Sequence, residues 1–567
     1  MKVGKRERRN VHVNINRTAA ILEQRADLPV LREEQPIVEA ILAAERSCVL
    51  ICGETGSGKT TQVPQFLWES GYGHEEGAAF GREGCIAVTE PRRVAAVSMA
   101  QRVAEELNVT FGEEVGFHVR YENNISDRCK LKFATEGIIL KEIQNDFLLR
   151  KYSVIVVDEA HERSVSCDLL IGLLSRIVPL RNDLFKEELR KCGGDTKLTK
   201  IKPFRLVIMS ATMRVMDFRD NTKLFPITPT LINVEARRFP VTNHFSRKTV
   251  VHNYVDEAFR MVRQLHKKLP PGGVLVFLCT QHEIEDFCTR LRNHYSETRI
   301  EYYEDGYSKH SLVKKDRGGE HRSSDDDDDD GEKDEFGLKE DDYFLGEEDH
   351  KRPRDDTEEE ANEKEDEING ELNSMHVLPL YALLDTRKQK EVFNPPPKGK
   401  RLCVVSTNVA ETSITIPNIR YVVDCGRVKN KTMDKLTQAS CYKIEWTSQA
   451  SAEQRSGRAG RVGPGHCYRL YSTAVYSNVM SPHSVPEILR TPLESVVLLM
   501  KHIGIEQVGG FPFPSPPMEE DIKKCLDTPQ NHRGTDGRDL FHNTAGGKNA
   551  GLPRASPFRE GDRGVPG

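Results

Sequence analysis

Eight short apolar runs, each ending at a turn signal, limit this chain to a fold built on parallel sheets. Four lie within residues 28–240 and four within residues 241–475. Such runs are typical of strands buried on both faces, as in parallel sheets. They read SCVLICG, GCIAVTEP, SVIVVDEA and FRLVIMSAT in the first group, and GGVLVFLCT, RLCVVSTN, IRYVVDCG and HCYRLYS in the second. The sequence therefore predicts an α/β fold of two tandem parallel-sheet lobes with a cleft between them.

Two stretches outside these runs stand out by their charge. Residues 1–27 read as a basic N-terminal extension, whereas residues 303–374 interrupt the second lobe with runs such as SSDDDDDDGEKDE. Residues 301–370, which overlap almost all of this stretch, include 29 acidic and 11 basic residues. A segment this charged and this poor in apolar residues cannot offset its ordering entropy, which predicts a disordered acidic insert. It can be a passive loop, an electrostatic mimic of RNA or a docking site for a basic partner.

The C-terminal part changes character after the second lobe. Within residues 476–527, PLESVVLLMKHIGI predicts an amphipathic helix and MEEDIKKCL opens another, whereas residues 528–567 lack apolar periodicity and predict a disordered tail. The 13 cysteines include no C-x-x-C pair, which favours a reducing compartment. No stretch approaches the roughly 18 apolar residues of a membrane span. We therefore expect a soluble, intracellular protein without a membrane partner.

A glycine-rich loop sits between the first apolar run and a helical pattern. It reads GETGSGKT and predicts a phosphate-binding loop made of Gly53, Glu54, Thr55, Gly56, Ser57, Gly58, Lys59 and Thr60. Backbone N–H groups and a helix N-terminus face the phosphates in such a loop, while the lysine meets the β- and γ-phosphates and the threonine ligates magnesium. A chance glycine-rich turn would not be flanked by both a strand and a helix. The motif indicates a bound nucleotide.

An acidic pair follows the third apolar run, at the strand end where ligands of open α/β sheets bind. Asp158 can hold magnesium, with Thr60, and Glu159 can orient and deprotonate an attacking water. The pair could instead cap the next helix. Downstream of a phosphate-binding loop, the sequence favours phosphoryl transfer to water, with magnesium near Thr60, Asp158 and Glu159.

A basic stretch in the second lobe, QRSGRAGR, can complete such a site from across the cleft. Arg458 and Arg461 are three positions apart, so on a helix both would face one phosphate. Arginines supplied in this way stabilise the charge of the transition state. Taken alone, the same stretch would read as a solvated basic helix.

Eight short motifs, in this order and spacing, resemble the series of the DEAH-box RNA helicases. They are GETGSGKT, TEPRR (89–93), TEG (135–137), DEAH (158–161), SAT (210–212), VFLCTQHEIE (276–285), TNVAETSITI (407–416) and QRSGRAGR (454–461). The resemblance extends over approximately residues 28–520. It implies two RecA-like lobes, followed by a partial winged-helix segment at 476–527, and an ATP-driven enzyme that requires Mg²⁺ and acts on RNA.

The resemblance also assigns roles to matching positions. It implies that Lys59, Thr60, Asp158 and Glu159 bind and hydrolyse ATP, that His161 and Gln454 couple the lobes, and that Arg458 and Arg461 are the arginine fingers. The base would stack between Arg102 and Phe393, which predicts loose nucleotide preference. The RNA backbone would be held by Arg92, Arg93, Thr135, Thr407 and Asn408, and hydrolysis would be linked to lobe movement by Ser210 and Thr212. Phe393 could also be an ordinary core aromatic, and Arg102 a surface ion-pair residue.

The amino-acid sequence in and around these motifs most resembles the branch of this family that acts in the nucleolus on the small-subunit ribosomal RNA precursor. This implies a nuclear and nucleolar location, pre-ribosomal RNA or an associated small RNA as substrate, and pre-ribosomal particle proteins as partners. The resemblance stops at about Leu526, before the ratchet and OB-like domains of the family, so we expect a C-terminally truncated motor. Two alternatives stay open: an RNA- and nucleotide-binding scaffold with little unwinding, and a motor that acts on DNA or protein.

Overall fold

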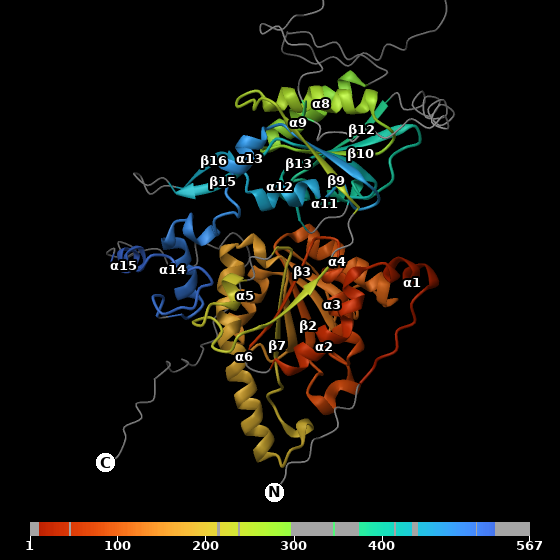
Figure 1. Ribbon diagram of the computed structural model, residues 1–567. Coiled ribbons are helices and arrows are strands. Elements are labelled where there is room, and N and C mark those ends of the chain that lie inside the picture. Colours follow the sequence, from red (N-terminus) through yellow and green to blue (C-terminus); the bar gives the residue numbers. More distant parts are fainter. Residues whose placement is uncertain are drawn as a thin grey trace, which may run out of the picture.

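The computed structural model describes residues 11–44, 47–212, 216–235, 239–295, 344–345, 374–412, 416–433, 440–505 and 507–527. Within these residues the chain forms two stacked lobes with a smaller C-terminal segment beside the first (Figure 1). The predicted insert at 303–374 lies outside the described residues except for Phe344–Leu345, which form a strand, and Ser374, where the next strand begins. The predicted tail at 528–567 lies wholly outside them.

The first lobe is built on an eight-stranded sheet in the order β4-β3-β5-β2-β6-β7-β1-β8. All neighbouring strands are parallel except β3 and β4. The strands are β1 (Val49–Gly53), β2 (Cys85–Glu90), β3 (Val115–Val119), β4 (Glu122–Asn124), β5 (Leu131–Thr135), β6 (Tyr152–Val157), β7 (Arg205–Ser210) and β8 (Thr230–Val234). The four apolar runs predicted for this lobe form most or all of β1, β2, β6 and β7.

Helices cover both faces of this sheet, because its central strands are apolar on both sides. One face packs on α2 (Glu34–Ala43), α3 (Lys59–Glu69) and α4 (Arg93–Leu107), and the other on α5 (Glu136–Asn145) and α6 (Val165–Lys191). Alternate residues of β1 divide between the two cores: Val49 and Ile51 join the first, Leu50 and Cys52 the second. The carboxyl ends of the parallel strands are left open for a site.

The second lobe repeats this architecture on a seven-stranded sheet in the order β11-β9-β17-β14-β10-β13-β12. Only the short β11 is antiparallel to its neighbour. The strands are β9 (Val241–Ser246), β10 (Gly273–Phe277), β11 (Phe344–Leu345), β12 (Ser374–Leu380), β13 (Lys400–Ser406), β14 (Ile419–Asp424) and β17 (Gly465–Arg469). The four runs predicted for this lobe form β10, β13, β14 and β17, which confirms the tandem α/β fold.

Two long helices, α8 (Tyr254–Lys268) and α9 (Gln281–His294), cover the face of the second sheet that points away from the first lobe (Figure 1). Helix α9 begins with a capping box between Thr280 and Glu283. The shorter elements are α1 (Ala19–Ala26), α7 (Met216–Arg219), α11 (Thr386–Glu391), α12 (Gln449–Ser456), α13 (Thr473–Asn478), the hairpin β15 (Arg427–Met433) and β16 (Ser440–Trp446), and the 3-10 turns η1 (Pro29–Glu33), η2 (Glu75–Phe80), η3 (Ala160–Glu162), η4 (Thr196–Leu198), η7 (Asn408–Ala410) and η8 (Glu487–Leu489).

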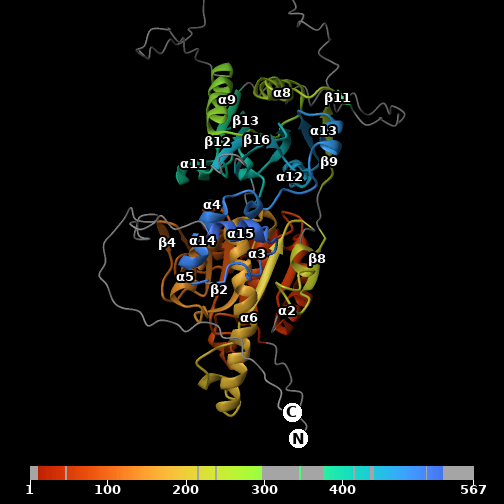
Figure 2. The same cartoon turned by 90° about the vertical axis from the view of Figure 1, so that its left-hand side faces the viewer.

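The C-terminal segment packs on the first lobe although it follows the second in sequence. Its helices α14 (Leu493–His502) and α15 (Glu519–Asp527) lie beside α5 and α6 in both views (Figures 1 and 2). Ile488, Val496 and Met500 are buried in the core that includes α5 and α6. Both helices predicted for this segment are present. Their packing attaches the C-terminal segment to the first lobe.

Arg163 joins this segment to the first lobe from just behind the DEAH motif. Its side chain is 1% exposed and contacts Asp168 at 2.9 and 3.1 Å, Asp217 at 2.5 Å and the Ser515 hydroxyl at 2.8 Å. In addition, the Glu487 carboxylate accepts a hydrogen bond from the Val165 N–H group at 3.0 Å. One buried guanidinium thus fixes three segments that are far apart in sequence.

Arg163→Ala is expected to lower the free energy of unfolding by about 3–5 kcal/mol, because it leaves the fully buried Asp168 carboxylate without its guanidinium. Urea denaturation followed by circular dichroism measures this loss. Lys191→Ala is the matched control: it breaks an exposed ion pair with Glu187 and should change the midpoint very little. Equal losses in the two variants would contradict the assignment.

The predicted N-terminal extension, residues 1–27, also packs on the first lobe where it is described. Arg25 is buried and its Nε donates to Gln62 Oε1 at 2.6 Å, and Arg17 forms an ion pair with Glu69. The Val13 N–H group donates to the Glu69 carbonyl at 2.8 Å. Basic residues of this stretch therefore neutralise carboxylates of the lobe, which composition alone did not indicate.

Candidate active site

The phosphate-binding loop joins β1 to α3 as predicted, and its lysine is held inside it. Lys59 is 6% exposed, and its Nζ donates to the carbonyl oxygen atoms of Gly53 and Glu54 and to Ser57 Oγ, the last two at 2.9 and 3.2 Å. Gly56 and Gly58 have φ values of 93° and 90°, in the left-handed region that glycine adopts without strain. The loop therefore turns its backbone N–H groups and the N-terminus of α3 toward an incoming anion.

The carboxylates Asp158 and Glu159 follow β6, next to this loop. Thr60 Oγ1 donates to Asp158 Oδ2 at 2.5 Å, and the Glu159 N–H group donates to Asp158 Oδ1 at 2.7 Å. Burial and the neighbouring Glu159 raise the pKa of Asp158 to about 7, and a bound cation would favour its ionised form. A hydroxyl and two carboxylates are hard oxygen ligands, which fit Mg²⁺ completed by water and phosphate.

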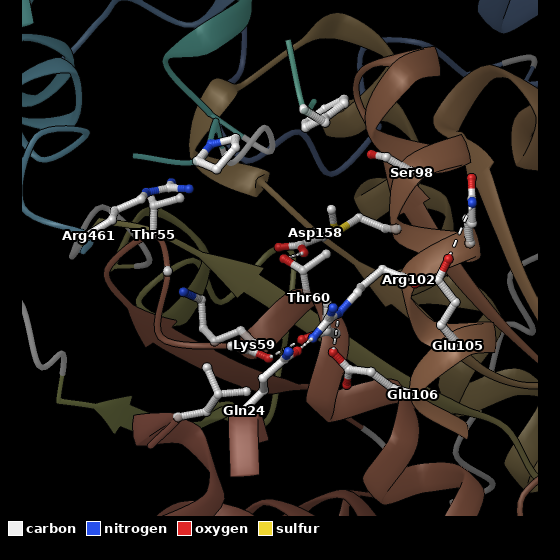
Figure 3. A pocket seen from close by; sticks show the side chains of 18 of the residues that line it. Gln24, Thr55, Lys59, Thr60, Ser98, Arg102, Glu105, Glu106, Asp158 and Arg461 are labelled. Atoms are coloured by element: carbon white, nitrogen blue, oxygen red, sulfur yellow. Dashed lines mark hydrogen bonds and ion pairs between the residues drawn. The ribbon is translucent and has the colours of Figure 1, made fainter. Parts of the chain in front are cut away.

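A cavity of about 870 Å³ opens in front of these groups and is lined by both lobes (Figure 3). The first lobe contributes Thr55, Gly56, Gly58, Lys59, Thr60, Asp158 and Glu159, and the second contributes Lys390, Phe393, Asn394, Pro417, Gly460 and Arg461. Cations and carboxylates thus meet at one cavity within the cleft that the sequence predicted.

Both residues predicted to hold the base line this cavity. Arg102, on α4, donates from Nε to Glu106 Oε1 at 2.6 Å and from its second terminal nitrogen to Gln24 Oε1 at 2.9 Å. Phe393 lies just beyond α11 and is half-buried. The sequence did not identify Gln24, Glu105 or Glu106 as lining residues, because none belongs to a recognisable motif.

The two predicted arginine fingers lie in different surroundings. Helix α12 ends at Ser456, before either arginine, because glycines follow at 457, 460 and 463 and disfavour a helix. Arg461 lines the cavity beside Gly56, whereas the buried Arg458 donates to the Glu411 carbonyl. The expectation that both stand on a shared helix is therefore wrong, whereas their role as arginine fingers stays a prediction.

A hydrogen-bonded chain crosses the cleft through His161. The Ala211 N–H group donates to His161 Nδ1 at 3.2 Å, and the side-chain amide of Gln454 lies 2.9 Å from His161 Nε2. The Gln454 atom at this distance is the amide nitrogen Nε2, so the direction of this hydrogen bond depends on the tautomer of the imidazole ring. Beside Ala211, Ser210 Oγ accepts from the Thr212 N–H group at 3.3 Å. The predicted coupling residues are thus brought together.

A second link between the lobes runs through Glu162. Arg92 lies at 3.2 Å from Glu162 Oε1, and the Thr412 hydroxyl of the second lobe donates to the same oxygen. Although burial alone would raise it, the Arg92 guanidinium and the Thr412 hydroxyl lower the pKa of Glu162 and keep it ionised. Arg92, predicted to hold RNA, is thereby connected to the loop that carries Asp158 and Glu159.

The other residues predicted to hold RNA lie at carboxyl ends of strands. Thr135 ends β5 and Arg93 begins α4 after β2, with Arg93 3.8 Å from Glu122 Oε2 and more than half exposed. Thr407 and Asn408 follow β13 in the second lobe, and Asn408 is exposed. Strands β5 and β2 lie on one side of β6 and strands β7 and β1 on the other. The sheet order therefore separates these positions from the phosphate-binding loop.

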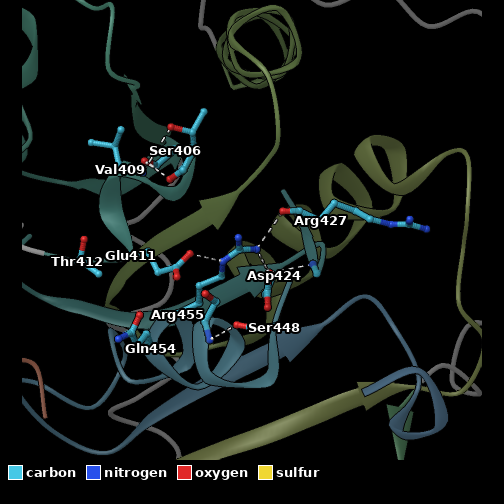
Figure 4. Close-up of polar contacts among 12 residues, drawn as sticks. Ser406, Val409, Glu411, Thr412, Asp424, Arg427, Ser448, Gln454 and Arg455 are labelled. Atoms are coloured by element: carbon cyan, nitrogen blue, oxygen red, sulfur yellow. Dashed lines mark hydrogen bonds and ion pairs between the residues drawn. The ribbon is translucent and has the colours of Figure 1, made fainter. Parts of the chain in front are cut away.

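A buried arginine to which the sequence motifs assigned no role stabilises this part of the second lobe. Arg455 is 1% exposed and forms ion pairs with Glu411 at 3.1 Å and Asp424 at 2.8 Å (Figure 4). It precedes Arg458 by three residues and follows Gln454 directly. These ion pairs fix the end of α12 and thereby the position of the groups that face the cleft.

Comparisons with known proteins agree with this geometry. The DEAD/DEAH box helicase family matches residues 33–220, and the Helicase conserved C-terminal domain matches residues 356–463. The chain is 48% identical over 525 residues to the probable ATP-dependent RNA helicase DHX37 of Homo sapiens, covering 90% of this chain and 43% of the relative. It is 45% identical over 556 residues to the probable ATP-dependent RNA helicase DHR1 of Saccharomyces cerevisiae, covering 97% and 42%.

A plant relative gives the same result. The ATP-dependent RNA helicase DEAH13 of Arabidopsis thaliana is 43% identical over 580 residues, covering 91% of this chain and 47% of the relative. The chain spans less than half the length of these relatives. It belongs to the DEAD/DEAH box helicase family. Within that family, the Asp158–His161 motif and these relatives place it in the DEAH-box group.

In the part of the chain that the structure describes, no helix has the length and apolarity to cross a membrane.

Proposed function

We propose that this chain is the motor of an ATP-dependent RNA helicase, which hydrolyses ATP between its lobes and moves on, or displaces, RNA strands. The observation that carries the proposal is one cavity in which Lys59, Thr60 and the carboxylate pair of the first lobe face Arg461 of the second. Because that cavity is shared, a change in the nucleotide alters the fit of the two lobes.

The residues divide the work of hydrolysis. Lys59 exchanges its loop carbonyl partners for the β- and γ-phosphates of ATP. Thr60 and Asp158 would hold Mg²⁺, which would supply charge neutralisation on the phosphates. Glu159 orients the attacking water and accepts its proton, and Arg461 stabilises the charge that develops on the transferred group.

Two connections make RNA contact and ATP hydrolysis interdependent. The motif from Asp158 to Glu162 carries the carboxylates at its start, His161 facing Gln454 of the second lobe, and Glu162 facing Arg92 and Thr412. RNA that engages Arg92 competes for the guanidinium held by Glu162, and this rearranges the same short loop. We therefore propose that RNA binding changes the position of Glu159 through the loop of residues 158–162.

We further propose that the RNA is held by its backbone, through Arg92, Arg93, Thr135, Thr407 and Asn408. Guanidinium, hydroxyl and amide groups suit phosphate and 2′-OH contacts, which position a strand without reading its sequence. The local wording of the motifs supports pre-ribosomal RNA or an associated small RNA in the nucleolus as the substrate, with proteins of that particle as partners. Cross-linking of the chain to RNA in cells, followed by sequencing, tests this substrate; recovery of messenger RNA alone would contradict it.

Phe393→Ala is expected to raise the KM for ATP about tenfold or more, because stacking on an aromatic ring contributes roughly 1–3 kcal/mol per base. GTP should be affected equally, since stacking does not read base edges. Steady-state hydrolysis at varied ATP and GTP measures both constants. Phe393→Tyr keeps the ring and should behave like the unaltered chain. An unchanged KM in Phe393→Ala would remove the base-stacking role and leave a core aromatic.

Competition between RNA and DNA tests the substrate class. Labelled single-stranded RNA is bound by the chain with a non-hydrolysable ATP analogue, and unlabelled RNA or DNA of equal length and sequence is added. RNA should displace the label at a lower concentration, because contacts to the 2′-OH are lost with DNA. Equal displacement by DNA would favour a motor that is not specific for RNA.

A further inference from the structure

Two cysteines lie close together where strands of the first sheet begin, at the end of the sheet opposite the nucleotide cavity. Cys85 is the first residue of β2, and Cys129 lies two residues before β5. Cys85 Sγ donates to the Ile86 carbonyl and Cys129 Sγ donates to the Leu131 carbonyl, both at 3.3 Å, and the two thiols also interact with each other. Both also line a second cavity, of about 430 Å³, together with His74, Arg128 and Lys130. The pair is therefore accessible to a small solute and remote from Lys59 and Asp158.

The two cysteines lie at the starts of adjacent parallel strands, where the ideal spacing of a sheet is compatible with a disulfide. Ile86 is in register with Leu131, and the Ile86 N–H group donates to the Lys130 carbonyl at 2.8 Å. Cys85 thus lies beside Lys130 and diagonally across from Cys129. Neighbouring strands about 4.8 Å apart with a rise of about 3.3 Å place such diagonal Cα atoms about 6 Å apart. Disulfides span Cα separations of about 4.4–6.8 Å.

The surroundings make the two thiols unequal. The hydrogen bond from Cys85 lowers the pKa of the Cys129 thiol, and the Lys132 ammonium adds to the effect against the opposing influence of burial. The same hydrogen bond, together with burial, raises the pKa of the Cys85 thiol. Because the thiolate is the nucleophile, the lowered pKa favours Cys129 as the sulfur that attacks an oxidant.

We propose that Cys85 and Cys129 form a peroxide-sensitive dithiol that closes to an intramolecular disulfide. The Cys129 thiolate attacks one oxygen of hydrogen peroxide, the O–O bond breaks, and a sulfenic acid and hydroxide result. The Cys85 sulfur then attacks the Cys129 sulfur, the S–O bond breaks, and the Cys85 proton leaves with the hydroxyl group as water. Two thiols are oxidised to one disulfide, and one peroxide is reduced to two waters.

A second pair of interacting thiols in the same chain provides an internal comparison. Cys279 and Cys425 lie at the carboxyl ends of β10 and β14 and also contact each other. They are only 6% and 2% exposed, whereas Cys85 and Cys129 are partly exposed. If access to peroxide decides the reaction, the Cys85–Cys129 pair must oxidise before the buried pair.

Peptide mapping tests the proposal on the whole 567-residue chain. The reduced chain is treated with hydrogen peroxide, remaining thiols are alkylated, and the digest is analysed by mass spectrometry. We expect a cross-linked peptide that joins Cys85 to Cys129, lighter by two hydrogens than the separate peptides, that appears before any Cys279–Cys425 link and disappears on reduction. Absence of this peptide in the folded chain, or earlier formation of the Cys279–Cys425 link, would overturn the proposal.

Two variants separate the roles of the sulfurs. Cys129→Ser should abolish the cross-link and leave Cys85 fully alkylated. Cys85→Ser should abolish it too, but leave a sulfenic acid at Cys129 that dimedone traps. Trapping at Cys85 rather than at Cys129 would contradict the assigned order. Circular dichroism verifies that each variant is folded, and the mapping of the unaltered chain decides the proposal if either is not.

Discussion

Glu159→Gln is expected to lower the RNA-stimulated rate of ATP hydrolysis by about 100- to 10,000-fold, the range that general-base catalysis contributes. Glutamine has nearly the same shape, so Lys59, Thr60 and Asp158 keep their places and ATP binding should persist. Phosphate release measures the rate, and a fluorescent ATP analogue measures affinity. The combination of lost turnover and retained binding is specific to a residue that acts on water.

Glu105→Gln is the matched control for this variant. Glu105 is also a carboxylate that lines the cavity, but it lies on α4 beside Arg102 and away from β6. Its replacement should leave the rate of hydrolysis nearly unchanged. A loss in Glu105→Gln as large as that in Glu159→Gln would mean that general electrostatics of the cavity, and not a positioned base, controls the reaction.

Arg461→Ala is expected to reduce kcat for ATP about 1,000-fold or more, because an arginine supplied from across the cleft stabilises the transition state by this factor. Its side chain reaches the phosphate-binding loop, where a Cβ placed on Gly56 would lie 4.0 Å from Arg461 Nε. Stability should change little. Arg461→Lys should recover only part of the rate, since an ammonium lacks the planar fork of guanidinium.

Arg458→Ala distinguishes a supporting arginine from one that faces the phosphates. The Arg458 guanidinium is buried and donates to the Glu411 carbonyl, so its loss should lower the midpoint of urea denaturation as well as the rate. Arg461→Ala should lower the rate at an unchanged midpoint. If instead Arg458→Ala alone lost turnover without loss of stability, the roles drawn from the structure would be reversed.

The parts of the site that could be predicted from the sequence depend on short stretches of chain. The loop from Gly53 to Thr60 needs only a strand before it and a helix after it, and all three are consecutive. Asp158 and Glu159 follow an apolar run whose place in a parallel sheet puts them at the same edge. Periodicity and turn chemistry were therefore sufficient for the two lobes and for the phosphate and carboxylate groups.

The rest depends on contacts between distant residues, which periodicity does not record. Arg163 contacts Ser515 across 352 positions, and Arg102 contacts Gln24 of the predicted N-terminal extension. Packing of the C-terminal segment on the first lobe follows from apolar complementarity with α5 and α6, not from chain order. The prediction that Arg458 and Arg461 share a helix was wrong because helical spacing was extended past the glycine at 457, where α12 has already ended.

Steady-state ATP hydrolysis by this 567-residue chain, with and without single-stranded RNA, tests the central claim most directly. A cavity completed by both lobes, with Glu162 tied to Arg92, predicts a several-fold rise in kcat on addition of RNA, and no rise in Glu159→Gln. Tight binding of RNA and nucleotide with turnover that RNA does not change would contradict the claim of a coupled motor and leave a scaffold that binds both.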